Sequence, residues 1–374
     1  FDKYIDIFTD HYCTPEGCYG PMVAAAHGKV SMETESWFTS SEYLLVQSMC
    51  QFLACGQLRL APWHPRVLYE PLPGSDGRRI ATPIVVASAA FNHMVTGKRF
   101  ERLVFHDHLP WLFQFGADDD PEALLVMFGR LCTIGQENPR RRLWTQVEAD
   151  EGGTITIDNS EGKLQFFDLA GNEKWRGREK ITLPMSILPT YIRCDEGPAA
   201  AAEVIRQARI EGKRPVELLP RDFATRVDAE NAALVVEVHN CLNRAIDGTL
   251  TVEPPATIKL ADEAVDVRLG AGEQRAFRLP IAEAEVDPSN AYPVSVRFTS
   301  EAGDAEYAES LHAAVAPKRT PQIDGDLADW ADVPGVRIAP TGKQRIDLSE
   351  LLRRPWLDAA ERHPDGTFAE LRMA

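Results

Sequence analysis

The chain has 374 residues, 44% hydrophobic and 26% charged, a composition typical of folded domains rather than of disordered protein. Its formal net charge is −16, whereas nucleic-acid-binding proteins need clustered lysines and arginines to contact phosphates. No apolar run reaches the length of about 18 residues that a membrane helix needs. We therefore predict no nucleic-acid partner and no membrane span.

Cysteine spacing and short motifs exclude several further classes. The seven cysteines are odd in number and scattered, which fits neither a zinc motif nor a disulfide framework. Glycine-rich phosphate loops, serine-centred elbows and paired CxxC motifs do not occur in the sequence. His106, Asp107 and His108 fit a polar hairpin turn better than a metal site. We predict no metal and no cofactor.

The first hundred residues alternate between strand and helix patterns. Ser40 and Gly56 are placed to cap and to end one helix, and Thr82 followed by Pro83 starts another. The βαβα order predicts a parallel sheet. The expected strands are residues 4–8, 29–34 and 57–61, and the expected helices are 41–54 and 83–95.

Beyond residue 101 the pattern changes to short alternating strands separated by turn signals, which predicts an antiparallel accessory sheet. An alanine-rich helix over 198–211, ended by Gly212, is expected to link this sheet to the next module. A further series of strands at roughly ten-residue spacing predicts an immunoglobulin-like β-sandwich. The expected strands are 102–106, 111–116, 123–129, 154–158, 163–168, 180–184 and 190–194 in the sheet, and 233–240, 248–253, 264–269, 274–280 and 292–298 in the sandwich.

The predicted fold class is therefore a multidomain chain, part α/β and part all-β. The chain begins and ends inside strand patterns, so we expect it to be a piece of a longer protein, and the missing signal peptide carries no conclusion about export. The expected modules are 1–100, an α/β unit; 101–197, the antiparallel β-domain; 198–214, the linker helix; 215–316, the β-sandwich; and 317–374, a truncated β module.

Three strand segments carry a resemblance to a known family. The segments are YIDIFTDHY over 4–12, KVSMETESW over 29–37 and QLRLAPWHP over 57–65. Their order resembles strands six, seven and eight of the clan A glycoside hydrolases, which are retaining (β/α)8-barrel enzymes. FFDLAGNEKW and KITLPMSILPTYI, over 166–175 and 180–192, resemble the small β-domain that follows the barrel in several such enzymes. The resemblance implies that 1–100 is the C-terminal part of a (β/α)8 barrel.

A second resemblance lies near the C-terminus. The segment TPQIDGDLADWADVPGVRI is similar to the opening of family 9 carbohydrate-binding modules, and FAELRMA resembles the next strand of such a module. This resemblance implies a truncated carbohydrate-binding-like module at 317–374. The matching residues are Ile323, Asp324, Gly325, Leu327, Asp329 and Trp330.

The second strand carries the candidate catalytic residue. Side chains two apart in a strand share a face, so Ser31, Glu33 and Glu35 are expected on one side. Retaining glycosidases use one carboxylate as nucleophile and a second as acid and then base. The resemblance implies that Glu35 is the nucleophile and that the acid/base precedes residue 1. Glu33 is expected to bind the sugar or to pair with a base, or to be the nucleophile itself if the register is two residues off.

The ends of the neighbouring strands supply the candidate substrate-binding residues. His11 and Tyr12 stand where clan A enzymes often place a pair that contacts the nucleophile and the sugar. Trp63 is suited to stack on a pyranose ring, and His64 can bond a hydroxyl. The alternatives are a capped strand end for His11 and Tyr12 and a buried anchor for Trp63.

The resemblances imply a retaining glycoside hydrolase that acts on a β-linked polysaccharide or oligosaccharide, is inactive as this piece alone, and is extracellular or periplasmic. The alternative is a non-catalytic glycan-binding surface protein that uses a degenerate barrel as a scaffold, since a fold does not establish chemistry. Trp37, which stands where the family often has a small residue, favours this alternative.

Overall fold

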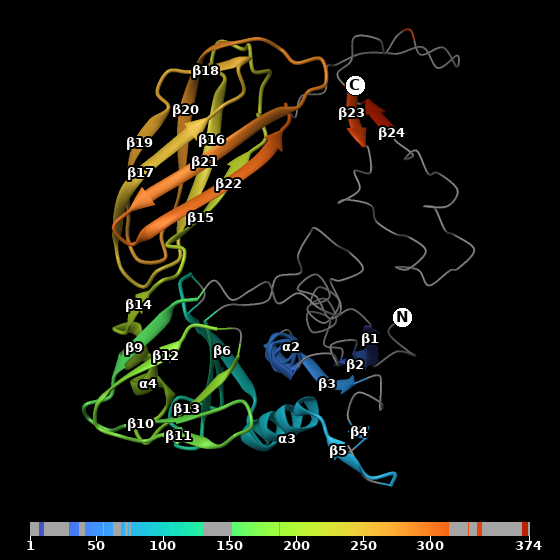
Figure 1. Cartoon of the computed structure of the whole chain (residues 1–374), viewed down its shortest axis with the longest axis vertical. Coiled ribbons are helices and arrows are strands. Elements are labelled where there is room, and N and C mark those ends of the chain that lie inside the picture. The colour runs from blue at the N-terminus through green and yellow to red at the C-terminus, as the bar shows by residue number, and fades with distance from the viewer. Residues whose placement is uncertain are drawn as a thin grey trace. The chain divides into compact units, whose positions relative to one another are not determined.

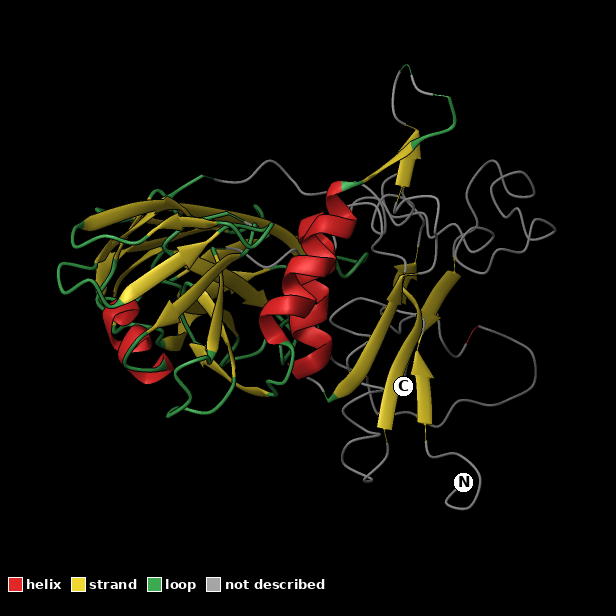
Figure 2. Cartoon of the chain, turned by 90° about the horizontal axis from the view of Figure 1, so that it is seen from below, coloured by secondary structure: helices red, strands yellow, loops and turns green. Residues whose placement is uncertain are grey.

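The structure is a computed structural model. It forms two compact units, residues 1–213 and 214–374, and strands dominate over helices in the part described (Figures 1 and 2). Within that part, no helix is both long and apolar enough to cross a membrane. The described residues are 7–10, 30–36, 42–54, 56–62, 69–71, 74, 76–105, 107–129, 152–186, 188–313, 328, 335–338 and 369–372.

The first unit begins with a three-stranded parallel sheet. Strands β1 (Ile7–Asp10), β2 (Val30–Ser36) and β3 (Gln57–Pro62) lie in the order β1-β2-β3, and α2 (Glu42–Ala54) connects the last two. The parallel sheet predicted from the βαβα order is confirmed. Three neighbouring parallel strands occur both in a (β/α)8 barrel and in an open α/β sheet. The barrel itself stays a prediction.

The second helix of this unit, α3 (Pro83–Val95), follows Thr82 and has proline at its first position, as predicted. A short antiparallel hairpin of β4 (Tyr69–Pro71) and β5 (Arg79–Ala81) precedes it. Helices α2 and α3 contact each other.

The antiparallel strands from residue 100 to residue 211 form two sheets rather than the single predicted one. The antiparallel strands of the larger sheet have the order β11-β10-β13-β8-β7-β6, and those of the smaller have the order β12-β9-β14. The larger sheet comprises β6 (Phe100–Phe105), β7 (Trp111–Phe115), β8 (Leu124–Phe128), β10 (Leu164–Phe167), β11 (Glu173–Trp175) and β13 (Thr190–Cys194), and the smaller comprises β9 (Thr154–Asp158), β12 (Lys180–Pro184) and β14 (Arg209–Glu211).

The predicted linker helix is shorter than expected and is not a linker. Helix α4 (Pro198–Arg206) buries Ala201, Ala202 and Ile205 and lies against β13 and β9. The prediction that it continues to residue 211 was wrong, because the chain leaves the helix and forms β14. There Ile210 is buried opposite Ile155 of β9, between two exposed neighbours, which is the period of a strand.

One hydrophobic core joins the two long helices to the larger sheet. Phe91 of α3 is fully buried, and its ring meets Phe115 of β7 edge to face, with centroids 5.8 Å apart. Residues of α2, α3, β7, β8 and β13 share this core: Leu45, Val46, Met49, Cys50, Ile84, Ala87, Phe91, Met94, Phe113, Phe115, Leu124, Val126, Phe128 and Tyr191.

A tight turn between β10 and β11 is held by the Asp168 carboxylate. Its Oδ1 accepts hydrogen bonds from the backbone N–H groups of Ala170 (3.0 Å) and Asn172 (2.9 Å), and Gly171 supplies the positive φ. Lys174 Nζ lies 3.0 Å from Oδ2. Burial pushes the pKa of Asp168 upward, but the hydrogen bonds and the lysine outweigh it, so the pKa lies below its usual range.

We expect Asp168→Ala to lower the free energy of unfolding at neutral pH by about 1–2 kcal/mol, because it removes hydrogen bonds to a charged acceptor. Folding lowers the pKa of this carboxyl, so the ionised group stabilises the folded protein at every pH above about 3.9, the pKa of an aspartate in the unfolded chain. This stabilisation is lost as the pH falls through the lower pKa of the folded state. The difference from the wild type should therefore shrink below about pH 4. Urea titrations across this range test it, with the exposed Asp119→Ala as control. A difference that grows on acidification would contradict it.

The second unit contains the predicted β-sandwich. Its two antiparallel four-stranded sheets have the orders β15-β16-β20-β18 and β19-β17-β21-β22. Buried and less buried residues alternate along β16, as expected for a strand with one face in a core. The strands are β15 (Val216–Arg221), β16 (Ala233–Asn240), β17 (Ile246–Glu253), β18 (Ile258–Leu260), β19 (Ala264–Leu269), β20 (Gln274–Ala284), β21 (Tyr292–Ser300) and β22 (Gly303–Leu311).

Two short strands near the C-terminus form an antiparallel pair, β23 (Gly335–Ile338) with β24 (Ala369–Arg372). Both fall in the segments that resemble a carbohydrate-binding module. The six residues of that motif, at 323–325, 327, 329 and 330, lie outside the described residues. The module stays a prediction.

Candidate active site

The middle strand of the parallel sheet carries both candidate acids. Glu33 of β2 is in register with Asp10 of β1 and with Leu60 of β3, and Ser36 is in register with Pro62. Glu35 therefore lies next to the carboxyl end of a strand that has a parallel partner on each side. Asp10, the last residue of β1, was not singled out from the sequence. The sequence feature that could have identified Asp10 as a site residue is its position as an acid at a strand end, directly before His11.

The pairing of β2 with β3 is irregular in the stretch that contains Thr34 and Glu35. Between Glu33 and Ser36 the chain advances three residues on β2 but only two on β3, from Leu60 to Pro62, so the register shifts by one. Such irregularities bend a strand and change where its side chains point, and they are over-represented next to active sites. The predicted nucleophile thus lies where the backbone departs from regular pairing.

The other predicted site residues follow the ends of the two outer strands. His11 and Tyr12 come directly after β1, which ends at Asp10, and Trp63 and His64 come directly after β3. All four lie outside the described residues. Because parallel strands present their carboxyl ends at one edge of a sheet, ligands of α/β proteins bind at that edge. The described backbone thus brings Glu33 and Glu35 to this edge and leaves the other four residues as predictions.

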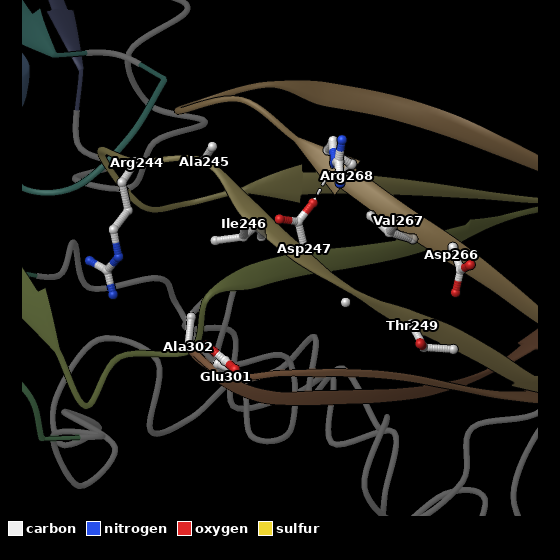
Figure 3. Close-up of a pocket in the computed structure, with 11 residues that line it drawn as sticks. Arg244, Ala245, Ile246, Asp247, Thr249, Asp266, Val267, Arg268, Glu301 and Ala302 are labelled. Carbon is white, nitrogen blue, oxygen red and sulfur yellow. Dashed lines mark hydrogen bonds and ion pairs between the residues drawn. The ribbon is translucent and has the colours of Figure 1, made fainter.

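The sandwich has a groove at one end of β17 and β19 (Figure 3). Asp247 and Arg268 form an ion pair across these strands, with Oδ1 2.6 Å from Nε. The described residues that line the groove include no aromatic ring on which a pyranose could stack. The lining residues are Arg244, Ala245, Ile246, Asp247, Gly248, Thr249, Asp266, Val267, Arg268, Glu301 and Ala302.

The segment with His106, Asp107 and His108 connects the antiparallel strands β6 and β7, as the predicted hairpin turn requires. The His108 side chain is buried. Its ring centroid lies 4.8 Å from that of Phe105, and its Nδ1 lies 2.7 Å from the carbonyl oxygen of Leu109. This histidine therefore has a packing role within the turn. His106 lies outside the described residues.

No protein-family model matches the chain, and no curated protein matches it. Several solved structures with partial similarity are glycoside hydrolases. One is a GH2 β-galacturonidase from Eisenbergiella tayi, which is 13% identical with a TM-score of 0.22. The match covers 57% of this chain and 43% of the galacturonidase chain. The exo-chitosanase CsxA of Amycolatopsis orientalis is 10% identical with a TM-score of 0.20, and the match covers 65% of this chain and 31% of the chitosanase chain. A calcium-binding mutant of β-glucuronidase 2 from Bacteroides uniformis is 12% identical with a TM-score of 0.21, and the match covers 51% of this chain and 26% of the glucuronidase chain. The chain thus spans less than half the length of each, and at such low TM-scores no conclusion rests on these likenesses.

Proposed function

We propose that β1, β2 and β3 are the last three strands of a (β/α)8 barrel that belongs to a retaining glycoside hydrolase acting on a β-linked polysaccharide or oligosaccharide. The observation that carries the proposal is the position of Glu35 at the carboxyl end of the middle strand of three parallel strands. Catalytic groups of such barrels stand at the carboxyl ends of their strands.

In this proposal Glu35 attacks the anomeric carbon while a second carboxylic acid protonates the departing glycosidic oxygen. The result is a glycosyl ester on Glu35, which water hydrolyses with the second residue acting as base, so that the configuration is retained. The second residue belongs to an earlier barrel strand. His11 and Tyr12 orient the nucleophile, and Glu33, Trp63 and His64 bind the sugar.

The competing function is glycan binding without catalysis, by an extracellular or periplasmic protein with the same scaffold. Trp37 favours it, because clan A glycoside hydrolases often have a small residue at this position. Both functions predict a glycan ligand. They differ in whether a covalent intermediate forms on β2.

Trapping of that intermediate tests the proposal. The natural full-length polypeptide is incubated with 2-deoxy-2-fluoro glycosides that carry a good leaving group, and the labelled peptide is mapped by mass spectrometry. The fluorine slows hydrolysis of the glycosyl ester, so we expect the label on Glu35. A label on Glu33 would move the nucleophile by two residues. A label outside β2, or binding of glycans with no label, would contradict the enzyme and support the binding protein.

A further inference from the structure

Three metal-ligating side chains meet at one end of the β-sandwich. Glu217 of β15 lies directly opposite His239 of β16, and its Oε2 is 3.3 Å from the imidazole Nδ1. Cys241 follows two residues after His239, and its backbone N–H donates to the carbonyl of Pro215, which continues the pairing of the two strands. One carboxylate oxygen, one imidazole nitrogen and the thiol sulfur all lie within 4.8 Å of one another.

The alternation of a strand explains this convergence. His239 and Cys241 are two residues apart and so share a face, and the cross-strand register adds Glu217 beside them. The surroundings suit ligation. Glu217 is exposed and can adjust its rotamer, whereas His239 and Cys241 are half-buried.

A carboxylate–imidazole pair across two strands occurs without any metal and stabilises a sheet only slightly. The Cys241 thiol is not part of that pair. Its Sγ lies 3.6 Å from the carbonyl oxygen of His239, a weak contact that leaves the sulfur beside the imidazole and the carboxylate. The described cysteines Cys50 and Cys194 are buried, whereas Cys241 stands at the sheet surface within reach of the two other donors. A thiolate, an imidazole and a carboxylate together form a donor set typical of zinc rather than of calcium or magnesium.

We propose that Glu217, His239 and Cys241 bind a divalent cation of the zinc class. A tetrahedral zinc site places its ligand atoms about 3.3–3.8 Å apart. Glu217 Oε2 and His239 Nδ1 are already 3.3 Å apart, and the Cys241 sulfur, within 4.8 Å of the other two donors, needs to approach them by at most about 1.5 Å. Binding releases the thiol proton of Cys241, and water takes the fourth position. The site is independent of the proposed glycosidase chemistry. No sequence motif indicates the site, because Glu217 and His239 are 22 positions apart and only the strand pairing brings them together.

Cobalt is the probe for this site. The full chain is freed of metal with a chelator and titrated with Co²⁺, which takes zinc sites and absorbs visibly. We expect one equivalent to give a thiolate-to-cobalt charge-transfer band and the visible bands of a four-coordinate ion, and added Zn²⁺ to remove them. Cys241→Ser should abolish the charge-transfer band. Cys194→Ala, which removes a thiol from the other unit, should leave it unchanged.

A second variant tests the ligand set at an exposed position that does not put folding at risk. Glu217→Gln should retain the charge-transfer band but weaken Co²⁺ binding at least about tenfold, since even outer partners of metal ligands contribute that much. The proposal is overturned if one equivalent of Co²⁺ gives no band, if the band survives Cys241→Ser, or if Glu217→Gln binds Co²⁺ as tightly as the wild type.

Discussion

Replacing Glu35 with alanine in the full-length protein is expected to lower kcat on a β-glycoside by about 10⁴-fold or more, the size of effect that follows removal of a nucleophile. The reaction then has no group to form the glycosyl ester, although the proton donor remains. KM should change much less, because substrate contacts outside the reacting centre are kept. Steady-state kinetics with an aryl glycoside measure both values.

Added azide separates loss of the nucleophile from loss of structure. A small anion can occupy the space left by the carboxylate and attack the anomeric carbon, so Glu35→Ala with azide should recover activity and give the glycosyl azide of inverted configuration. Glu33→Ala is the matched control on the same strand. We expect it to raise KM and not to respond to azide. An azide response in Glu33→Ala and none in Glu35→Ala would assign the nucleophile to Glu33.

Phe91→Ala is expected to destabilise the first unit by about 3–5 kcal/mol, the cost of removing a fully buried phenylalanine and leaving a cavity. Domains of this kind are stable by about 5–15 kcal/mol, so the variant loses a large fraction of the total. Phe91 lies in the core that joins α3 to the larger sheet. The loss should therefore appear in the helix and in the sheet together.

Urea titration followed by hydrogen exchange with mass spectrometry measures this. Amide protection should fall in peptides from β7 and β8 as well as in those from α3. Val86→Ala is the control on the same helix, because Val86 is 43% exposed, and it should change the stability by no more than about 0.5 kcal/mol. Unfolding of α3 in Phe91→Ala with unchanged protection in β7 and β8 would show that helix and sheet do not share a core.

Elements with strong local signals were predicted well from the sequence. Helix α3 begins where Thr82 and Pro83 predict, and β16 and β19 have the predicted bounds, because both are rich in valine, a residue that favours strands. Strands that are defined mainly by their pairing with another strand were not predicted. Strand β22 has five consecutive exposed residues and carries no apolar alternation, so it is defined by its pairing with β21. The sequence pattern predicts a helix across β14, because the three residues of this strand are recognisable only beside β9.

The candidate sites also differ in how far local sequence pattern could predict them. The position of Glu35 at a strand end follows from local pattern, and the parallel order of β1, β2 and β3 confirms the backbone that the prediction required. The shift of register between Glu33 and Ser36 depends on β3 and cannot be predicted from the β2 sequence. The cluster of Glu217, His239 and Cys241 is a product of pairing alone, and no spacing rule for metal motifs detects it.

The core shared by α2, α3 and the larger sheet also limits how this chain can be divided for expression or recombination. A cut near residue 100 follows the change in sequence pattern, but it would leave Phe113, Phe115 and Phe128 facing water on one piece and bare helix faces on the other. Both pieces would then be prone to aggregate. A cut near residue 213 instead leaves each hydrophobic interior whole, so the sandwich is the part of this protein that can be transplanted into an unrelated fusion.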